Sequence, residues 1–476
     1  METIDQIYID QIYIDGAYVT PHGTELFDLH NPATGDVIGR VRLGDETDAR
    51  AAIAAAKRAF PAFSQTSKAD RIAMLRRMHD AVTARADALT EAVILEYGAP
   101  ASRARWMAEY AASVLADAAR TLEDYDFTRR IGSATVTMEP LGVVGIITPW
   151  NSNAGFICSK LAMVVASGST CVIKPSEMSA MQTRIVLEAL HEAGLPAGVF
   201  NIVNGRGDTV GAEFSTHPDI AKVSFTGSTA TGRAILKAAS DTFKRVTLEL
   251  GGKSPMLILD DADFAEAVPF ALQAGYMNSG QACIAGTRIL VPEARLAEFE
   301  AAIAAGVATI KSGDPRDPAT AIGPMVSEKQ WQRVQSYIRR GIEEGATLLA
   351  GGEGRPEGET GGWFVRPTIF TAVRNDMVIA RDEIFGPVLS IIAYGSEEEA
   401  IAIANDTSYG LHAYVASADP ARARKVAGRL VAGRVIINGA PMEPLAPFGG
   451  FKHSGIGREN GVFGLEAYLE PKAVMG

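Results

Sequence analysis

The pattern of hydrophobic positions changes character along the chain. Between residues 48 and 125, apolar residues recur at helical spacing in Ala-rich stretches such as DARAAIAAAKRAF, which predicts amphipathic helices. Residues 133–150 switch to β-branched alternation and then to a continuous apolar run. This change predicts an exposed hairpin that leads into a buried parallel strand.

Beyond this strand, short apolar runs alternate with helical stretches. Strands are predicted in STCVIKP, GVFNIVN and IAKVSFTG, with a helix after each, and a second round begins after residue 252 with PMLILDD. Residues 351–362 are Gly-rich and predict a surface loop or hairpin. Alternation of this kind is typical of an α/β fold with doubly wound parallel sheets.

Composition and charge limit the classes of function. The net charge of -11, without clusters of Lys and Arg, argues against nucleic acid as a partner. No apolar run is long enough to span a bilayer, and the acidic start lacks the order of a signal peptide. Three cysteines, Cys158, Cys171 and Cys283, cannot form a disulfide framework, so a cytoplasmic location is expected.

The N-terminus contains a tandem repeat, QIYID at residues 6–10 and again at 11–15. We interpret it as a duplication whose second copy forms the true first strand.

Cys283 stands apart from the other two cysteines. Cys158 and Cys171 lie in apolar stretches, as small buried residues do, whereas Cys283 lies in the polar, Gly-rich NSGQACIAG. A flexible loop that presents a thiolate, with backbone amides to stabilise it, predicts a nucleophile. A cysteine hydrolase would also need a His base near the thiol. Of the seven His residues, only His453 lies in a segment with other candidate site residues, PFGGFKHSGIGRE at 447–459.

Seven motifs in order carry a family resemblance. They are TPWN (148–151), IKPSE (173–177), FTGSTATG (225–232), ELGGKSP (249–255), GQACIAGTR (280–288), EIFGPV (383–388) and PFGGFKHSGIGRE (447–459). Together they resemble the aldehyde dehydrogenase superfamily over essentially the whole chain. The resemblance implies two doubly wound Rossmann-type domains with a small β oligomerisation element. The implied activity is NAD-dependent oxidation of an aldehyde to the acid.

The resemblance also implies catalytic roles. Cys283 forms the thiohemiacetal and thioester, Asn151 and the Cys283 N–H stabilise the oxyanion, and Glu249 activates the hydrolytic water. Lys160 and Glu459 match a supporting proton relay. From the residues alone, Asn151 could instead cap a helix, whereas the apolar neighbours of Glu249 favour a raised pKa.

The predicted cofactor site lacks a GxGxxG fingerprint. A strand–turn–helix at Gly227 and Ser228 could instead hold phosphate, and the resemblance implies contact with the NAD pyrophosphate. Lys174 and Glu177 match residues that bind the adenosine ribose, so the Glu177 carboxylate should favour NAD over NADP. The resemblance also assigns Glu383 and Phe385 to the cofactor site. The remaining cofactor residues that it implies are Ile147, Thr148, Pro149, Trp150, Ser176, Gly207, Gly211, Phe225, Thr226, Thr231, Leu250 and Gly251. No metal site is predicted.

The substrate pocket departs from the family pattern. Ser152, Asn153 and Ala154 stand where the family often has a bulky aromatic and a Pro, which should widen the pocket or add polar contacts. The loop at 439–450 is expected to form another wall, with Glu443 in solvent. Alternatives are an acylating dehydrogenase that transfers the acyl group to coenzyme A, the cysteine hydrolase, and an inactive binding protein.

The expected domains are a cofactor domain, a catalytic domain and an oligomerisation element. Their ranges are 1–121 with 141–251, then 252–446, then 122–140 with 447–476. We expect the hairpin and the tail to find no partner strand within a subunit, and therefore to pair across subunits of a homodimer or homotetramer.

Overall fold

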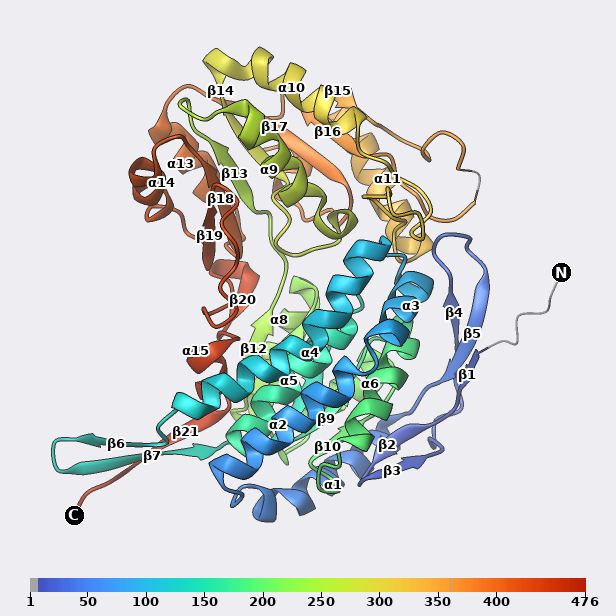
Figure 1. The fold of residues 1–476 in the computed structure, drawn as a ribbon, viewed down its shortest axis with the longest axis vertical. Helices are drawn as coiled ribbons and strands as arrows, with labels where there is room; N and C mark the ends of the chain where they lie inside the picture. The colour runs from blue at the N-terminus through green and yellow to red at the C-terminus, as the bar shows by residue number, and fades with distance from the viewer. Residues whose placement is uncertain (1–6, 360) are drawn as a thin grey trace.

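The computed structural model describes residues 7–359 and 361–476, which form two lobes, each around a large sheet (Figure 1). The lower sheet has the order β20-β12-β11-β8-β9-β10-β2-β3. Its strands are β2 (Ile12–Ile14), β3 (Ala17–Val19), β8 (Val143–Ile147), β9 (Thr170–Lys174), β10 (Phe200–Ile202), β11 (Ile220–Thr226), β12 (Arg245–Glu249) and β20 (Gly455–Ile456). The five central strands, β12 to β10, run parallel.

The upper sheet has the order β15-β16-β17-β14-β13-β18-β19 and is parallel except for β15. Its strands are β13 (Pro255–Ile258), β14 (Arg288–Pro292), β15 (Thr347–Ala350), β16 (Thr368–Thr371), β17 (Val388–Tyr394), β18 (His412–Ala416) and β19 (Arg434–Ile437). β15 and β16 flank the predicted Gly-rich loop.

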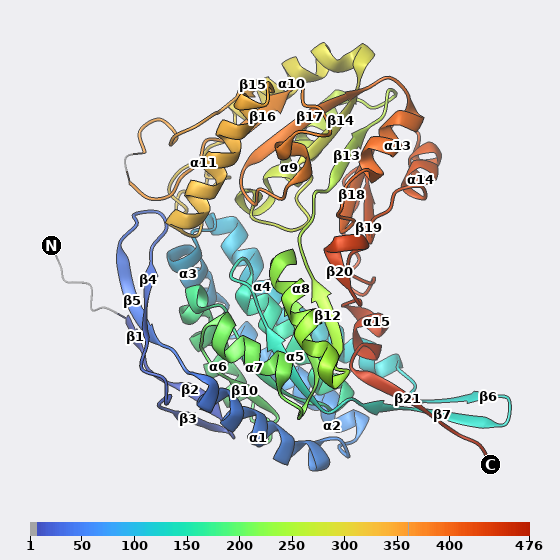
Figure 2. The same cartoon turned by 180° about the vertical axis from the view of Figure 1, so that it is seen from behind.

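Helices cover both faces of each sheet. On the lower sheet, α2 (Lys68–Thr83), α3 (Ala86–Tyr97), α4 (Ala101–Asp124), α5 (Asn153–Ser167) and α6 (Ala180–Glu192) lie on one face (Figure 1), and α1 (Glu46–Phe63), α7 (Ala212–Thr216) and α8 (Thr229–Ala239) on the other (Figure 2). On the upper sheet, α9 (Phe264–Tyr276) and α10 (Leu296–Ala308) oppose α11 (Glu328–Glu343), α12 (Val378–Arg381), α13 (Glu397–Asn405) and α14 (Pro420–Ala427).

This arrangement explains the continuous apolar runs of the central strands. In β8, Val144 and Ile146 pack against the first set of helices, whereas Val143 and Ile147 pack against the second. Because successive side chains of a strand point to opposite faces, a strand covered on both sides must be apolar throughout. The doubly wound α/β fold predicted from the sequence is confirmed.

The C-terminal tail pairs within the chain, contrary to the sequence-based prediction. β21 (Leu469–Val474) is antiparallel to β7 (Ala134–Pro140), which also pairs with β6 (Thr128–Ile131). Six backbone positions of β21 find partners on β7, so the expectation of unpartnered strands was wrong. The three strands project from the lower lobe (Figure 1), and the outer edges of β6 and β21 pair with no other described strand.

Both copies of the N-terminal repeat form strands. β1 (Ile7–Ile9), from the first copy, is parallel to β5 (Val37–Arg42), which also pairs with β4 (Leu26–His30), and β2 comes from the second copy. The prediction that the second copy forms the first strand was therefore wrong, because the same IYI triplet can pair in either place. The acidic start at residues 1–6 lies outside the described residues. Within 7–359 and 361–476, no helix is long and apolar enough to cross a membrane.

Candidate active site

Cys283 lies in the loop that precedes β14, where the backbones of two segments approach closely. A Cβ atom on Gly252 would lie 2.3 Å from the carbonyl oxygen of Cys283. Only a glycine allows this approach, which fixes the Cys283 loop against the segment that follows β12. Cys283 is partly exposed, whereas Cys158 and Cys171 are fully buried, as predicted.

Long-range hydrogen bonds hold this loop. Asn278 and Ser279 have φ angles of 55° and 59°, a left-handed conformation that non-glycine residues rarely adopt. The Asn278 side-chain amide donates to the carbonyls of Asn151 (3.2 Å) and Gln281 (3.1 Å), and Gln281 accepts from the Val326 N–H at 3.0 Å. The expected flexible loop is therefore an anchored one. The local sequence could not reveal partners so distant along the chain.

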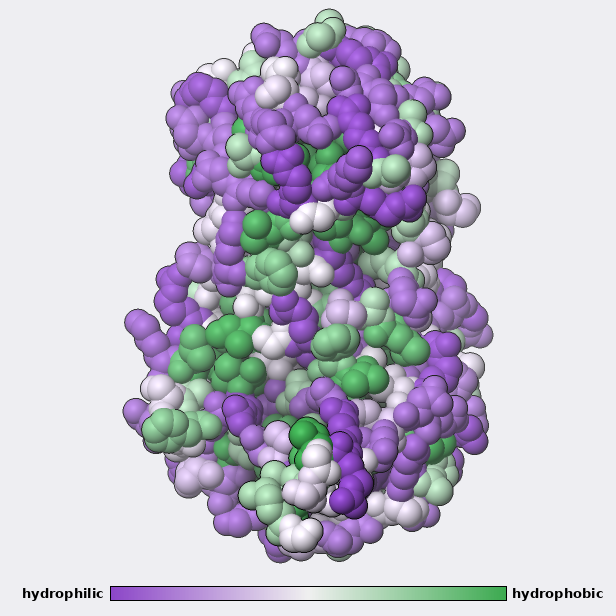
Figure 3. All heavy atoms as spheres, turned by 90° about the vertical axis from the view of Figure 1, so that its left-hand side faces the viewer, coloured by the Kyte–Doolittle hydropathy of each residue, from purple (hydrophilic) through white to green (hydrophobic). Residues whose placement is uncertain are grey.

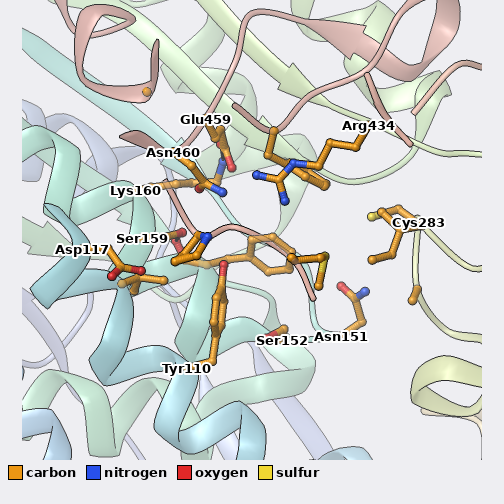
Figure 4. A pocket seen from close by; sticks show the side chains of 18 of the residues that line it. Tyr110, Asp117, Asn151, Ser152, Ser159, Lys160, Cys283, Arg434, Glu459 and Asn460 are labelled. Carbon is orange, nitrogen blue, oxygen red and sulfur yellow. Dashed lines mark hydrogen bonds and ion pairs between the residues drawn. The ribbon is translucent and has the colours of Figure 1, made fainter. Parts of the chain in front are cut away.

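Asn151 faces the same cavity as Cys283 (Figure 4). Its side-chain Nδ2 donates to the backbone carbonyl of Gln281 at 3.0 Å, two residues before the thiol. The residue at the N-terminal cap of α5 is Ser152, so the alternative interpretation of Asn151 as a helix cap is wrong. The amide carries two N–H groups and Gln281 occupies one, which leaves the second for a ligand in the cavity.

The surroundings of Cys283 shift the pKa of its thiol upward. Burial raises the pKa of Cys283, and the nearby Glu383 and Glu249 carboxylates raise it further. The backbone amides of Cys283 and Ile284 act in the opposite direction, as predicted from the sequence. Positive charge placed near the thiol would lower its pKa and favour the thiolate.

Glu249 ends β12 and is 2% exposed. Neither of its carboxylate oxygens has a hydrogen-bond partner among the described residues. Burial raises the pKa of Glu249 well above its ordinary value, and the neighbouring Glu459 carboxylate adds to the shift. A buried carboxylate without donors is suited to accept a proton.

The predicted relay residues meet beside Glu249. Lys160, on α5, forms an ion pair with Glu459 and donates to the Ser224 hydroxyl at 3.2 Å. Lys160 is almost completely buried, and Glu459 is its ion-pair partner. Both residues also line the cavity (Figure 4).

The residues predicted to bind the cofactor gather at the carboxyl ends of parallel strands. The Thr148 N–H, after β8, donates to the Lys174 carbonyl at the end of β9 (3.1 Å), and the Gly227 N–H, after β11, donates to the Glu249 carbonyl (3.0 Å). Ser228 caps α8 by accepting from the Thr231 N–H at 3.2 Å. Ligands of open α/β sheets bind at such an edge. The same edge includes Ile147, Pro149, Trp150, Phe225, Thr226, Leu250 and Gly251.

A charged carboxylate stands beyond β9. Glu177 accepts from Lys174 at 3.0 Å and lies 3.6 Å from Arg206. Burial alone would raise the pKa of Glu177, but these two cations lower it below its ordinary value. Ser176 caps the short turn that contains Glu177. Gly211 borders Lys174 and Ile147, and the Cβ direction of Gly207 is open.

Glu383 and Phe385 approach from the upper lobe. Glu383 accepts from the Gly252 N–H at 3.0 Å, and burial raises the pKa of its carboxyl to about 7. Phe385 has a φ of 64°, and its ring meets the Trp150 ring edge-on at 5.4 Å between centroids. Both predicted residues thus lie at the junction between the lobes.

A cavity of about 420 Å³ extends from Cys283 and Asn151 to Lys160, Glu459 and Asn460 (Figure 4). Its walls come from α4, α5, the Cys283 loop and the C-terminal segments. The sequence reasoning missed the α4 wall, formed by Arg103, Trp106, Tyr110, Val114 and Asp117. Their spacing of three and four residues, one face of a helix, was the available signal.

Two predictions about the pocket had different outcomes. Of the three residues after Asn151, only Ser152 lines the cavity. Asn153 bonds instead to Thr148 (2.9 Å) and Thr183 (2.9 Å), so of the three only Ser152 can supply the expected polar contact. The predicted wall at 439–450 is confirmed by Met442, Pro444 and Phe448. Glu443 is exposed and is absent from the lining, as expected.

Comparison with known proteins places the chain in a family. The model of the aldehyde dehydrogenase family matches residues 18–474. A 3-succinoylsemialdehyde-pyridine dehydrogenase from a Pseudomonas species is 46% identical over 96% of both chains. Among solved structures, a variant of aldehyde dehydrogenase C from Pseudomonas syringae, complexed with NAD+ and octanal, is 45% identical with a TM-score of 0.96, covering 100% of this chain and 97% of that one.

A Mycobacterium tuberculosis aldehyde dehydrogenase complexed with NAD+ is 40% identical, with a TM-score of 0.96 and 99% of each chain covered. The chain belongs to the aldehyde dehydrogenase family. The predicted enzyme class is confirmed.

Proposed function

We propose that this aldehyde dehydrogenase uses NAD to oxidise an aldehyde to the carboxylic acid, through a thiohemiacetal and then a thioester on Cys283. The observation that carries the proposal is the meeting of Cys283 and Asn151 in one cavity, with Glu249 buried beside them. When bound, NAD supplies the hydride acceptor. The thiolate of Cys283 attacks the carbonyl carbon, and the free N–H of Asn151 and the Cys283 amide stabilise the oxyanion.

Glu249 then serves as general base for hydrolysis of the thioester. Its carboxylate does not line the cavity, so it must turn towards Cys283 to accept a proton from water. Gly449 leaves room beside it, since a Cβ there would lie 2.7 Å from a Glu249 oxygen. The Lys160–Glu459 pair receives the proton afterwards.

The site favours water as the acceptor of the acyl group over coenzyme A, and a dehydrogenase over a cysteine hydrolase. A base beside the thioester suits hydrolysis, whereas acyl transfer to coenzyme A does not need one. A cysteine hydrolase would need a histidine near the thiol, and no histidine is among the described residues that line the cavity.

NAD is the cofactor, and the edge formed by β8, β9, β11 and β12 holds it. Ser228 and Gly227, at the capped start of α8, suit the pyrophosphate, and Lys174 with Glu177 suits the adenosine ribose. Gly207 and Gly211 leave space on the adenine side. Glu383 and Phe385 hold the nicotinamide end of the cofactor. Residues 1–121 with 141–251 serve as the cofactor domain, and residues 252–446 serve as the catalytic domain.

The projecting sheet serves assembly of a cytoplasmic homodimer or homotetramer. Among the described strands, none pairs with the outer edges of β6 and β21, and Ile131 and Val474 are exposed on them. Strands or apolar side chains of a second copy can therefore cover these edges. Analytical ultracentrifugation of the full chain and of a version that ends before β21 measures how the loss of β21 changes the number of subunits in the assembly.

A panel of aldehydes assayed for NADH formation tests the proposal. Cys283→Ser should lose turnover because a neutral hydroxyl without an adjacent base is a poor nucleophile, while NAD binding by calorimetry persists. Cys158→Ser and Cys171→Ser, at buried positions, serve as matched controls and should keep activity. Substantial turnover by Cys283→Ser would refute the proposed role.

A further inference from the structure

The cavity carries an excess of positive charge that the oxidation of an aldehyde does not use. Three of its ionisable groups are compensated: Lys160 and Glu459 pair with each other, and Asp117 pairs with Arg120. Two guanidinium groups, those of Arg103 and Arg434, also line the cavity and form no ion pair with any described residue. Arg434 nevertheless donates to the backbone carbonyls of Pro447 and Ala446.

Arg103 differs from Arg434 because it has no hydrogen-bond acceptor among the described residues. Its Nε is buried and unpartnered. The guanidinium lies 3.9 Å from the centre of the Trp106 ring, and Trp106 in turn stacks on Tyr110, with 5.1 Å between centroids and 7° between planes. A cation held by stacking alone, with its donors free, costs free energy that an anionic ligand would offset.

The position of Arg103 gives it access to a ligand. It lies in the first turn of α4, whose N-terminus carries no side-chain cap, so the helix dipole adds positive potential there. Trp106 is 40% exposed and Met442 is 44% exposed, and both line the cavity. The cavity therefore opens to solvent beside these two side chains. Seen from the side of β19 and β20, hydrophobic residues gather at the narrow waist between the lobes (Figure 3).

We infer that the preferred substrates are aldehydes with an apolar or aromatic body and a carboxylate at the end remote from the reacting carbonyl, which Arg103 binds. The inference rests on the proposed function. The carbonyl lies at Cys283 and Asn151, the body packs between Trp106, Tyr110 and the Met and Phe side chains, and the carboxylate meets the free guanidinium donors. Arg103 is then a specificity-determining residue that does not touch the reacting atoms.

Matched substrates test this inference. For 4-formylbenzoate and its neutral analogue 4-formylbenzamide, the wild-type enzyme should give a kcat/KM at least about 10-fold higher with the carboxylate. Arg103→Met should remove this preference, mainly through KM, and leave kcat/KM for the amide within a few-fold. Arg103→Lys should keep part of it, and circular dichroism checks the fold of each variant.

Arg105→Met is the matched control, because Arg105 lies on the same helix but is exposed and paired with Asp87 and Glu109. It should keep the full preference. Equal wild-type efficiency with the two substrates, or a preference that survives in Arg103→Met, would overturn the inference while leaving the proposed function intact. If no aldehyde is oxidised, calorimetry with terephthalate still tests the anion site. Binding by the wild type that is lost in Arg103→Met supports the site. No binding by the wild type, or binding that Arg103→Met leaves unchanged, overturns the inference.

Discussion

Gly252→Ala should inactivate the enzyme without unfolding it. The added methyl group would lie 2.3 Å from the Cys283 carbonyl oxygen, whereas ordinary contact begins at 3.4 Å. The two backbones must therefore separate by about 1.1 Å (3.4 less 2.3). The Gly252 φ is compatible with Ala, so the effect is steric and not conformational. A displacement of about 1 Å at a reacting group costs roughly 100-fold in rate, and kcat should fall by about that factor.

The assay is steady-state NADH formation for Gly252→Ala and for Gly428→Ala. The second substitution is the control, since its Cβ would meet only ordinary contacts at 3.5 and 3.6 Å. Thermal unfolding confirms that both variants fold, and NAD titration separates damage to the thiol from damage to the cofactor site. A Gly252→Ala enzyme with wild-type kcat would refute the claim that this contact positions Cys283.

Four further predictions concern Glu249, Glu459 and Glu177. Rapid mixing of Glu249→Gln should show a burst of about one NADH per site followed by slow turnover; equal slowing of both phases would argue against a role in hydrolysis. The wild-type kcat should fall as pH drops through the raised pKa of Glu249, because only the ionised carboxylate accepts a proton. Glu459→Gln removes a neighbouring negative charge and should move that fall to lower pH; an unmoved profile contradicts the coupling. Glu177→Ala should narrow the preference for NAD over NADP in kcat/KM, and an unchanged ratio would place discrimination elsewhere.

The sequence could reveal the parts of the site that local patterns encode. Cys283 lies in a polar loop unlike those of the other cysteines, and Asn151 and Glu249 each follow or end a recognisable strand. Parallel strands bring their carboxyl ends to one edge, so Asn151 and Glu249 could be grouped before the structure was known, whereas Cys283 precedes a strand of the other sheet. Their catalytic and cofactor-binding roles remain predictions from the family resemblance.

Features that depend on distant partners could not be predicted. The anchoring of the Cys283 loop needs Val326, and the pairing of the tail joins residues more than 300 positions apart, such as Leu469 and Pro140. Arg103 and Trp106 occupy a helix face, but nothing in the sequence says that this face borders the thiol. The repeated IYI triplet favoured a strand without specifying which sheet it would join.

The most direct test of the account is to find where the acyl group is attached. Glu249→Gln enzyme, incubated with NAD and an aldehyde and then digested, should yield an acylated peptide that contains Cys283, observed by mass spectrometry, in the same amount as the NADH burst. Peptides that contain Cys158 and Cys171 should stay unmodified. NADH formation with no acyl group on Cys283, or with the acyl group on another residue, would contradict the proposed mechanism.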